Sequence, residues 1–210
     1  MADARTSGLV FLDGGFGTMI QVAGLKSGED PTDWNISHPE AVTAVHRAYV
    51  EAGSAIVMTN TFGANQLKYR GSHDLAALIR AAVANARAAG PAEVALDIGP
   101  TGRLLKPVGD LDFETAYAAF AAQVRVGAEA GVDRVIIETM GDTMELKAAV
   151  LAAKENCDLP VWAMVALGED GKLLTGASVE CVAALLESLG VDAYGFNCGL
   201  GPDLMLPYVK

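Results

Sequence analysis

The sequence alternates short, mostly apolar segments rich in β-branched residues with longer, alanine-rich segments of helical spacing. The apolar segments are residues 9–13, 55–60, 94–98, 134–139, 161–167 and 193–198. Segments that are apolar on both faces are typical of strands in a parallel sheet covered by helices. The pattern therefore predicts a βα unit repeated six times.

Residues that start and stop helices mark the segments between these strands. Ser37 and Glu40 have the spacing of a capping box, and Gly53 is placed to end the helix that follows. The remaining helices are predicted to begin at Asp74, Asp112, Asp142 and Ser178, the last with its end at Gly190.

Two architectures accommodate repeated βα units: an open, doubly wound sheet or a closed eight-stranded barrel. Six strands fit the open sheet by number. Most predicted strands, however, end in polar residues or glycines, at residues 13–15, 59–61, 97–99, 138–139 and 197–198. A ring of polar groups at successive strand ends is typical of a barrel active site, whereas a doubly wound sheet gathers its site at one switch point. We therefore expect an α/β fold of the (β/α)8 barrel type that is incomplete, with about six βα units and without its last two strands. Residues 1–210 are expected to form this single domain, truncated at its C-terminal end.

Charge and cysteine content exclude several classes of protein. Fifteen basic and 26 acidic residues give a formal net charge of −11, which argues against a surface for nucleic acid or anionic membranes. No apolar run approaches the roughly 18 residues that span a bilayer, and residues 1–8 do not resemble a secretory signal. Three scattered cysteines without a CxxC motif favour a reduced, cytoplasmic setting.

Cys198 lies where the last predicted strand gives way to a loop. From the sequence it is a thiolate nucleophile, one ligand of a metal ion, or a small buried side chain. Cys157 and Cys181 fall on helical segments, and none of the three histidines has metal-ligand spacing to another histidine.

Glu138 is the second candidate, because a carboxylate at the end of an apolar strand must be paired, hydrogen-bonded or protonated. It is expected to bind a substrate cation, act as a base, support a metal, or simply pair with a basic residue. Asp13 is placed to bind an ammonium group. Gly14 and Gly15 allow backbone N–H groups to approach a ligand, or form a plain turn. The Gly15-x-Gly17 pattern lacks the third glycine of a dinucleotide fingerprint, and no helix is evident there. Thr61 is a weaker candidate for polar contact, since the 59–65 segment equally suits helix capping.

In combination these motifs resemble the homocysteine S-methyltransferase family, closest to the homocysteine-binding barrel of its cobalamin-dependent members. The resemblance is carried by residues 13–18, 59–64, 97–102, 138–139, 145–153, 174–176 and 195–202. It implies a barrel in which Zn²⁺, bound by three cysteines, takes up homocysteine as a thiolate for methyl transfer to give methionine. It further implies that Cys198 is the first zinc ligand, that Asp13 and Glu138 hold the ammonium group, and that the backbone of Gly14 and Gly15 lies near the carboxylate.

The sequence departs from the family at the metal. The other two zinc ligands of the family are adjacent cysteines at the end of the eighth strand, and this sequence has no Cys-Cys pair. The methyl donor stays open between methylcobalamin or methyltetrahydrofolate on a separate domain or protein and a small methylated compound. Two alternatives are a methyltransferase that passes methyl groups to a corrinoid protein and a non-catalytic module that binds an amino acid or takes part in assembly. Without two strands, the first and sixth strands are expected to expose an apolar seam. We therefore expect that the chain either self-associates through this seam or is a truncated product of a longer protein.

Overall fold

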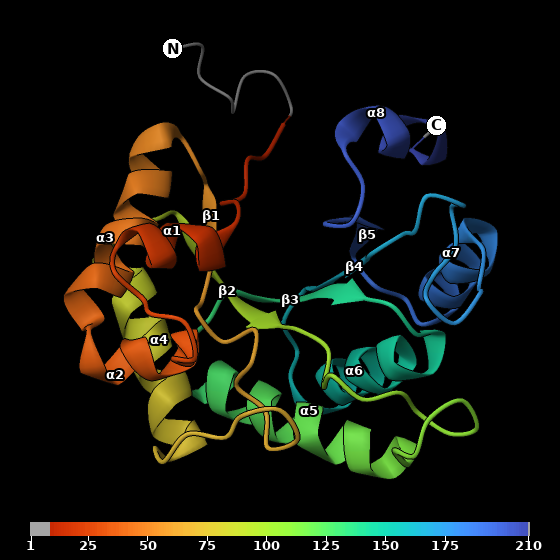
Figure 1. Cartoon of the computed structure of the whole chain (residues 1–210), viewed down its shortest axis with the longest axis horizontal. Helices are drawn as coiled ribbons and strands as arrows, with labels where there is room; N and C mark the ends of the chain where they lie inside the picture. Colours follow the sequence, from red (N-terminus) through yellow and green to blue (C-terminus); the bar gives the residue numbers. More distant parts are fainter. Residues whose placement is uncertain (1–8, 210) are drawn as a thin grey trace.

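A curved parallel sheet organises the structure, a computed structural model that describes residues 9–209 (Figure 1). Its strands are β1 (Ile56–Met58), β2 (Glu93–Ile98), β3 (Arg134–Met140), β4 (Val161–Val165) and β5 (Ala193–Phe196). They pair in sequence order, each parallel to its neighbours. Residues 1–8, on which the expectation of no secretory signal rests, lie outside the described residues.

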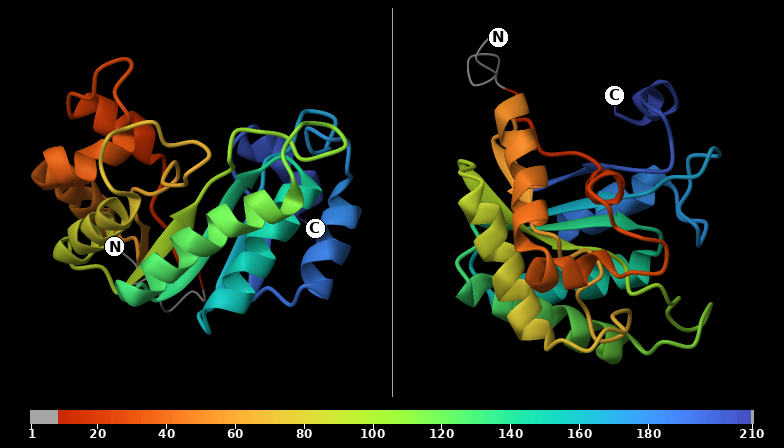
Figure 2. Two further views of the ribbon diagram at one scale, coloured as in Figure 1. Left: turned by 90° about the horizontal axis from the view of Figure 1, so that it is seen from below. Right: turned by 60° about the vertical axis from the view of Figure 1, so that its left-hand side comes forward.

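The helices alternate with the strands and follow one another around the outside of the sheet (Figure 1). They are α1 (Phe16–Val22), α2 (Trp34–Ser37), α3 (Pro39–Ala52), α4 (Leu75–Ala88), α5 (Phe113–Glu129), α6 (Thr143–Asn156), α7 (Val179–Ser188) and α8 (Pro202–Met205), with the 3-10 turns η2 (Pro31–Asp33) and η3 (Leu206–Tyr208). Figure 2 shows α5 and α6 lying side by side beneath the sheet, where they pack on each other. The expected α/β fold, an incomplete barrel, is confirmed.

The first predicted strand, residues 9–13, is reduced to a single bridge. Leu12 pairs in parallel with Ile56 of β1, and the neighbouring Asp13 N–H donates to the Ile56 carbonyl at 3.1 Å. Six full strands were predicted, and the segment 9–13 is the one that does not form a full strand. Leu9, Val10 and Phe11 are more than half exposed, so little packing holds this segment in an extended strand.

Several helix starts also differ from the expectation. Helix α1 begins at Phe16, where no helix was expected from the sequence. The capping box at Ser37 is absent, because Ser37 is the last residue of α2, its hydroxyl donates to the Asp33 carbonyl at the start of that helix, and His38 is the residue that precedes α3. Asp74 and Asp142, in contrast, cap α4 and α6 through their side chains as predicted.

Alternation along the strands divides the core into two layers. Val94, Leu96, Val135 and Ile137 pack outward in the large cluster beneath the helices. Their neighbours on the opposite face form a smaller inner cluster, in which Ile56, Ala95 and Ile136 contact Leu12, Met58, Trp162 and Met164. Residues two positions beyond this inner cluster therefore point inward, at the carboxyl ends of the strands.

The sheet does not close on itself within residues 9–209. In this range β5 pairs only with β4, and the Leu12 segment pairs only with β1. The same residues contain no helix with the length and apolar character that crossing a bilayer requires.

Candidate functional site

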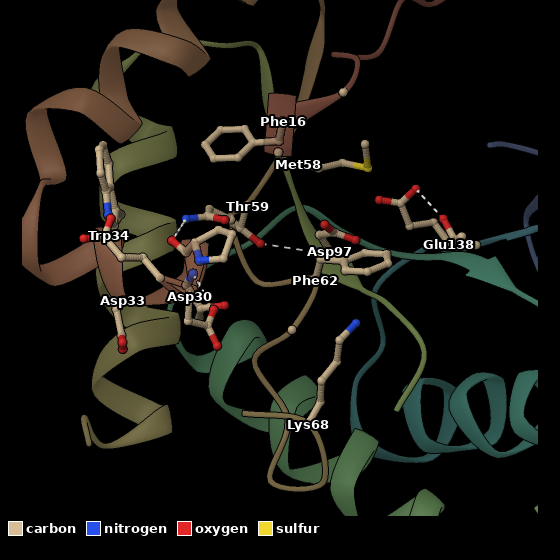
Figure 3. A pocket seen from close by; sticks show the side chains of 18 of the residues that line it. Phe16, Asp30, Asp33, Trp34, Met58, Thr59, Phe62, Lys68, Asp97 and Glu138 are labelled. Atoms are coloured by element: carbon tan, nitrogen blue, oxygen red, sulfur yellow. Dashed lines mark hydrogen bonds between the residues drawn. The ribbon is translucent and has the colours of Figure 1, made fainter. Parts of the chain in front are cut away.

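A cavity of about 1420 Å³ opens at the carboxyl ends of the strands (Figure 3). Its wall includes the inward-facing carboxyl groups of Asp13, Asp97 and Glu138, with Cys198 at the rim. Asp97 follows inward-facing Ala95 by two residues, and Glu138 follows Ile136 by two. Strand periodicity thus brings both acids to the same side of the sheet.

Asp13 is buried and only half satisfied. Its Oδ2 accepts a hydrogen bond from the Met58 backbone N–H at 3.0 Å, while its Oδ1 is buried without a partner among the described residues. Burial raises the pKa of Asp13 to about 7, against the effect of the Met58 N–H and reinforced by the negative charge of Glu138. An incoming cation would give Asp13 the partner that it lacks.

Glu138 is held by its neighbours on β3 and on the loop after β5. The Asn197 amide and the Thr139 hydroxyl both donate to Glu138 Oε2, the latter at 3.2 Å. Asn197 Oδ1 also accepts from the Thr139 backbone N–H at 2.9 Å. Burial raises the pKa of Glu138, and hydrogen bonds from Asp97, Thr139 and Asn197 oppose that rise. Within residues 9–209 Glu138 forms no ion pair with a lysine or arginine, which removes the plain salt-bridge interpretation.

Two residues beside the cavity have positive φ although neither is glycine. Thr139 has φ 58° and Cys198 has φ 57°, a conformation that is unusual for a β-branched residue such as threonine. Thr139 Oγ1 lies 3.6 Å from Cys198 Sγ, so the two strained positions face each other. Strain of this kind concentrates at functional sites, where the surrounding structure must hold it.

Asp97 is the site residue that the sequence reasoning did not select. It is 6% exposed, and its side chain meets Glu138 within hydrogen-bonding reach. Burial raises its pKa well above the usual range, with the charge of Glu138 as the next cause. Its place at a polar strand end was the signal available in the sequence, and the structure adds that it pairs with Ile136 of β3.

Thr61 does not reach the cavity, in contrast to the expected polar contact with a ligand. Its side chain is 0% exposed, and its hydroxyl donates to the Asp97 carbonyl at 2.7 Å. Thr61 therefore supports Asp97 from below.

Gly14 and Gly15 line the cavity next to Asp13. The Tyr49 hydroxyl donates to the Gly15 carbonyl at 3.1 Å. A Cβ at Gly14 would lie 3.3 Å from the same hydroxyl, so little room exists for a side chain there. Both glycines bring the backbone close to the acidic cluster.

Farther out, the cavity wall is aromatic and carries a basic side chain. Lys68 points from its loop toward Phe62 and Asp97, and its Nζ lies 4.3 Å from the centre of the Phe62 ring (Figure 3). Burial lowers the pKa of Lys68. Phe16 and Trp34 line the same space, which is much larger than one small amino acid requires.

A zinc centre does not fit the described residues. A catalytic zinc site takes three protein ligands, and no group of three His, Cys, Asp or Glu side chains in residues 9–209 is arranged for one. Cys198 is exposed at the rim and is available as one ligand, with Asn197 Nδ2 at 3.4 Å from its sulfur. Cys157 bonds the Ala153 carbonyl at the end of α6, and Cys181 is exposed on α7.

These side chains form a small acidic recess with a thiol at its edge. Three carboxyl groups share it, and Lys68 is the nearest basic group that acts on Asp97. Such a site suits a ligand that carries a positive group, which the carboxyl groups would pair with.

Known proteins show the same pattern over nearly the whole chain. The sequence model of the family described as homocysteine S-methyltransferase matches residues 10–210. The methionine synthase of Mycobacterium leprae is 31% identical over 223 residues, which cover 94% of this chain and 18% of that protein. The methionine synthase of Mycobacterium tuberculosis is 30% identical over 235 residues, covering 100% of this chain and 19% of that protein. The chain thus spans less than a fifth of the length of these two relatives.

Solved structures agree on the fold. The metallated form of the Escherichia coli homocysteine methyltransferase MmuM superposes with a TM-score of 0.85 at 23% identity, covering 98% of this chain and 80% of that one. Its apo form gives a TM-score of 0.77 at 24% identity, covering 96% and 76%. The family match and the two mycobacterial relatives lead to one conclusion: this chain belongs to the homocysteine S-methyltransferase family.

Proposed function

We propose that the cavity binds homocysteine as the acceptor of a methyl group, in a reaction that yields methionine. Asp13 and Glu138 receive the ammonium group, the backbone of Gly14 and Gly15 lies near the carboxylate, and the thiol points to Cys198. The single observation that carries this proposal is the buried, unpartnered Oδ1 of Asp13 beside Glu138, at a rim that ends in a cysteine. An ammonium group satisfies such carboxylates through charge-assisted hydrogen bonds.

The proposed reaction also needs a group that activates the thiol and a donor of the methyl group. The family resemblance implies zinc, for which Cys198 would be one ligand, while residues 9–209 contain no group of three such ligands. The similarity to methionine synthases supports a donor carried by cobalamin on a separate domain or protein. Three free cysteines support a reduced, cytoplasmic setting.

The test compares homocysteine with its analogue 4-mercaptobutanoate, which lacks the amino group. Glu138→Gln is expected to weaken homocysteine binding roughly 10–100-fold, because a hydrogen bond to a charged group contributes about 1.5–3 kcal/mol. The analogue should bind the unaltered chain and the variant equally well. Calorimetric titration of both ligands measures the difference.

Glu29→Gln is the matched control, since Glu29 is exposed, lines the same cavity and lies apart from the acidic cluster in sequence. It should leave both affinities unchanged. Equal losses for homocysteine and the analogue in Glu138→Gln would contradict an ammonium site at Glu138.

A non-catalytic amino-acid-binding module is the second candidate, favoured by the incomplete metal ligand set. The two candidates share the binding step and differ in turnover. Formation of methionine from homocysteine by the chain, supplied with zinc and a methyl donor, supports the enzyme; binding without turnover supports the module.

We also propose that residues 1–210 are one domain that self-associates through its open sheet edges. Phe11 is 51% exposed beside the Leu12 bridge, and Tyr194 is exposed on the outer strand β5. An unpaired, apolar sheet edge favours pairing with another chain.

Phe11→Asp is expected to weaken the dimer at least tenfold, because it places a charge in an apolar contact. Sedimentation velocity over a range of concentrations measures the effect. Val22→Asp, on α1 at a position that is 85% exposed, is the control and should leave the association constant unchanged. A stable monomer at every concentration of the unaltered chain would refute self-association.

A further inference from the structure

Three hydrogen bonds with side chains fix the backbone of Asp97. Its N–H donates to Thr59 Oγ1 at 3.1 Å, and its carbonyl accepts from Thr61 Oγ1 at 2.7 Å and from Gln123 Nε2 at 3.1 Å. The two hydroxyls also bond each other at 2.7 Å. Three buried polar side chains, two from the loop after β1 and one from α5, therefore hold one residue in place.

Within residues 9–209, no basic side chain forms an ion pair with the carboxyl group of Asp97. Its Oδ1 is buried and receives no hydrogen bond from a donor in residues 9–209. Lys68 is the basic group that acts on it, yet the Lys68 ammonium lies over the Phe62 ring and forms no ion pair in this range. An ionised carboxylate in such surroundings would be buried without compensation, which is costly.

The neighbouring Glu138 explains why the carboxyl group of Asp97 holds a proton. Two carboxyl groups within hydrogen-bonding reach are both acceptors when ionised and repel each other, so one of them holds a proton. Glu138 already receives hydrogen bonds from Asn197 and Thr139, which stabilise its charged form. Asp97 has none, and Asp13 adds further negative charge nearby. The proton therefore belongs on Asp97.

We propose that Asp97 is a positioning residue of the amino-acid site: as a neutral carboxylic acid it donates a hydrogen bond to Glu138, which thereby stays ionised and aimed at the ligand's ammonium group. Asp97 itself neither contacts the ligand nor transfers its proton. The identity of the ligand rests on the proposed function, whereas the relation between the two carboxyl groups holds in the ligand-free protein.

Carboxyl ¹³C NMR of the ligand-free, unaltered chain tests the protonation directly. Asp97 is expected to show the chemical shift of a carboxylic acid at pH 7. An ionised Asp97 at that pH would overturn the proposal without reference to any ligand.

Two substitutions then distinguish a hydrogen-bond donor at position 97 from a side chain that only fills space. Asp97→Asn keeps a neutral donor, so homocysteine affinity should stay within about twofold and the Glu138 titration should stay in place. Asp97→Leu removes the donor, so affinity should fall about tenfold, and the Glu138 titration midpoint should move upward. A residue with a purely structural role would move neither the midpoint nor the selectivity against 4-mercaptobutanoate.

Each result of these measurements either supports or overturns the role proposed for Asp97. Equal behaviour of the Asn and Leu variants, in affinity and in the Glu138 titration, overturns the proposal. If Asp97→Leu fails to fold, the NMR measurement and Asp97→Asn still decide. If no variant binds homocysteine but Asp97 is protonated and only the Leu variant moves the Glu138 midpoint, the proposed function fails while the role of Asp97 stands.

Discussion

Replacing Asp13 with asparagine is expected to stabilise the ligand-free fold at pH 8 by about 2–4 kcal/mol. The pKa of Asp13 rises from an ordinary value of 3.8 to about 7 on folding, because burial disfavours its charge. The folded chain therefore holds more protons on this group than the unfolded chain between about pH 4 and 7. By linkage, the Asp13 contribution is most favourable below pH 4 and is lost as pH rises through 7.

Asparagine removes this dependence while it keeps the local hydrogen bond. Its Oδ1 accepts from the Met58 N–H as Asp13 Oδ2 does, and its Nδ2 replaces the unpartnered oxygen. Urea unfolding at pH 5 and pH 8 measures the free energy of unfolding, and the gain of the variant over the unaltered chain should be larger at pH 8. The same substitution should weaken homocysteine binding roughly 10–100-fold, since it removes a charge-assisted hydrogen bond.

Asp30→Asn is the control for loss of one negative charge in the cavity wall. Asp30 Oδ1 accepts from the Thr32 N–H at 2.9 Å, a cap that asparagine retains. A difference between pH 5 and pH 8 that is the same in both variants would show that Asp13 is not the group responsible. A group that lowers the stability of the fold, as the buried Asp13 does at pH 8, is usually retained because it contributes to binding.

Strand periodicity made part of this site predictable from sequence. Glu138 follows the apolar run of β3 and Asp13 precedes a glycine turn, so each stood out as a charge at the end of an apolar segment. Asp97 has the same placement, but the network that fixes it comes from Thr59, Thr61 and Gln123, each of which lies at least 26 residues from Asp97 in sequence. Contacts of this kind depend on how a loop and a helix pack against β2, which no local pattern encodes.

Two predictions from the sequence were wrong, at the start of α1 and at residues 9–13, and they have similar causes. Helix α1 follows two glycines and has no side-chain cap, so its start carries no capping signal. The apolar segment 9–13 reads as a strand by propensity, yet it has one neighbour only and is largely exposed. Tertiary packing decides such cases over intrinsic preference.

Asn197→Ala is expected to lower the free energy of unfolding by about 2–3 kcal/mol, because one amide holds several groups of the site. Its Oδ1 accepts from the Thr139 N–H, and its Nδ2 donates to Thr139 Oγ1 at 2.8 Å and to Glu138. These bonds hold Thr139 at a positive φ that costs about 1–3 kcal/mol for a residue other than glycine. Without Asn197, Thr139 is free to leave this conformation and Glu138 loses a donor, so homocysteine affinity should fall about tenfold or more.

Thr139→Gly separates the two effects in a double-mutant cycle. Glycine adopts φ 58° without strain, which offsets the loss of the hydroxyl bonds, so the single variant should be nearly neutral in stability. In its background Asn197→Ala breaks one hydrogen bond fewer, and its cost should shrink by about 1 kcal/mol. Asn156→Ala, which removes an amide bonded to Tyr117 on the helical face, is the control and should change stability but not homocysteine binding. Additive stability changes at Asn197 and Thr139 would contradict the coupling, because the amide would then stabilise the loop without holding Thr139 in its strained conformation.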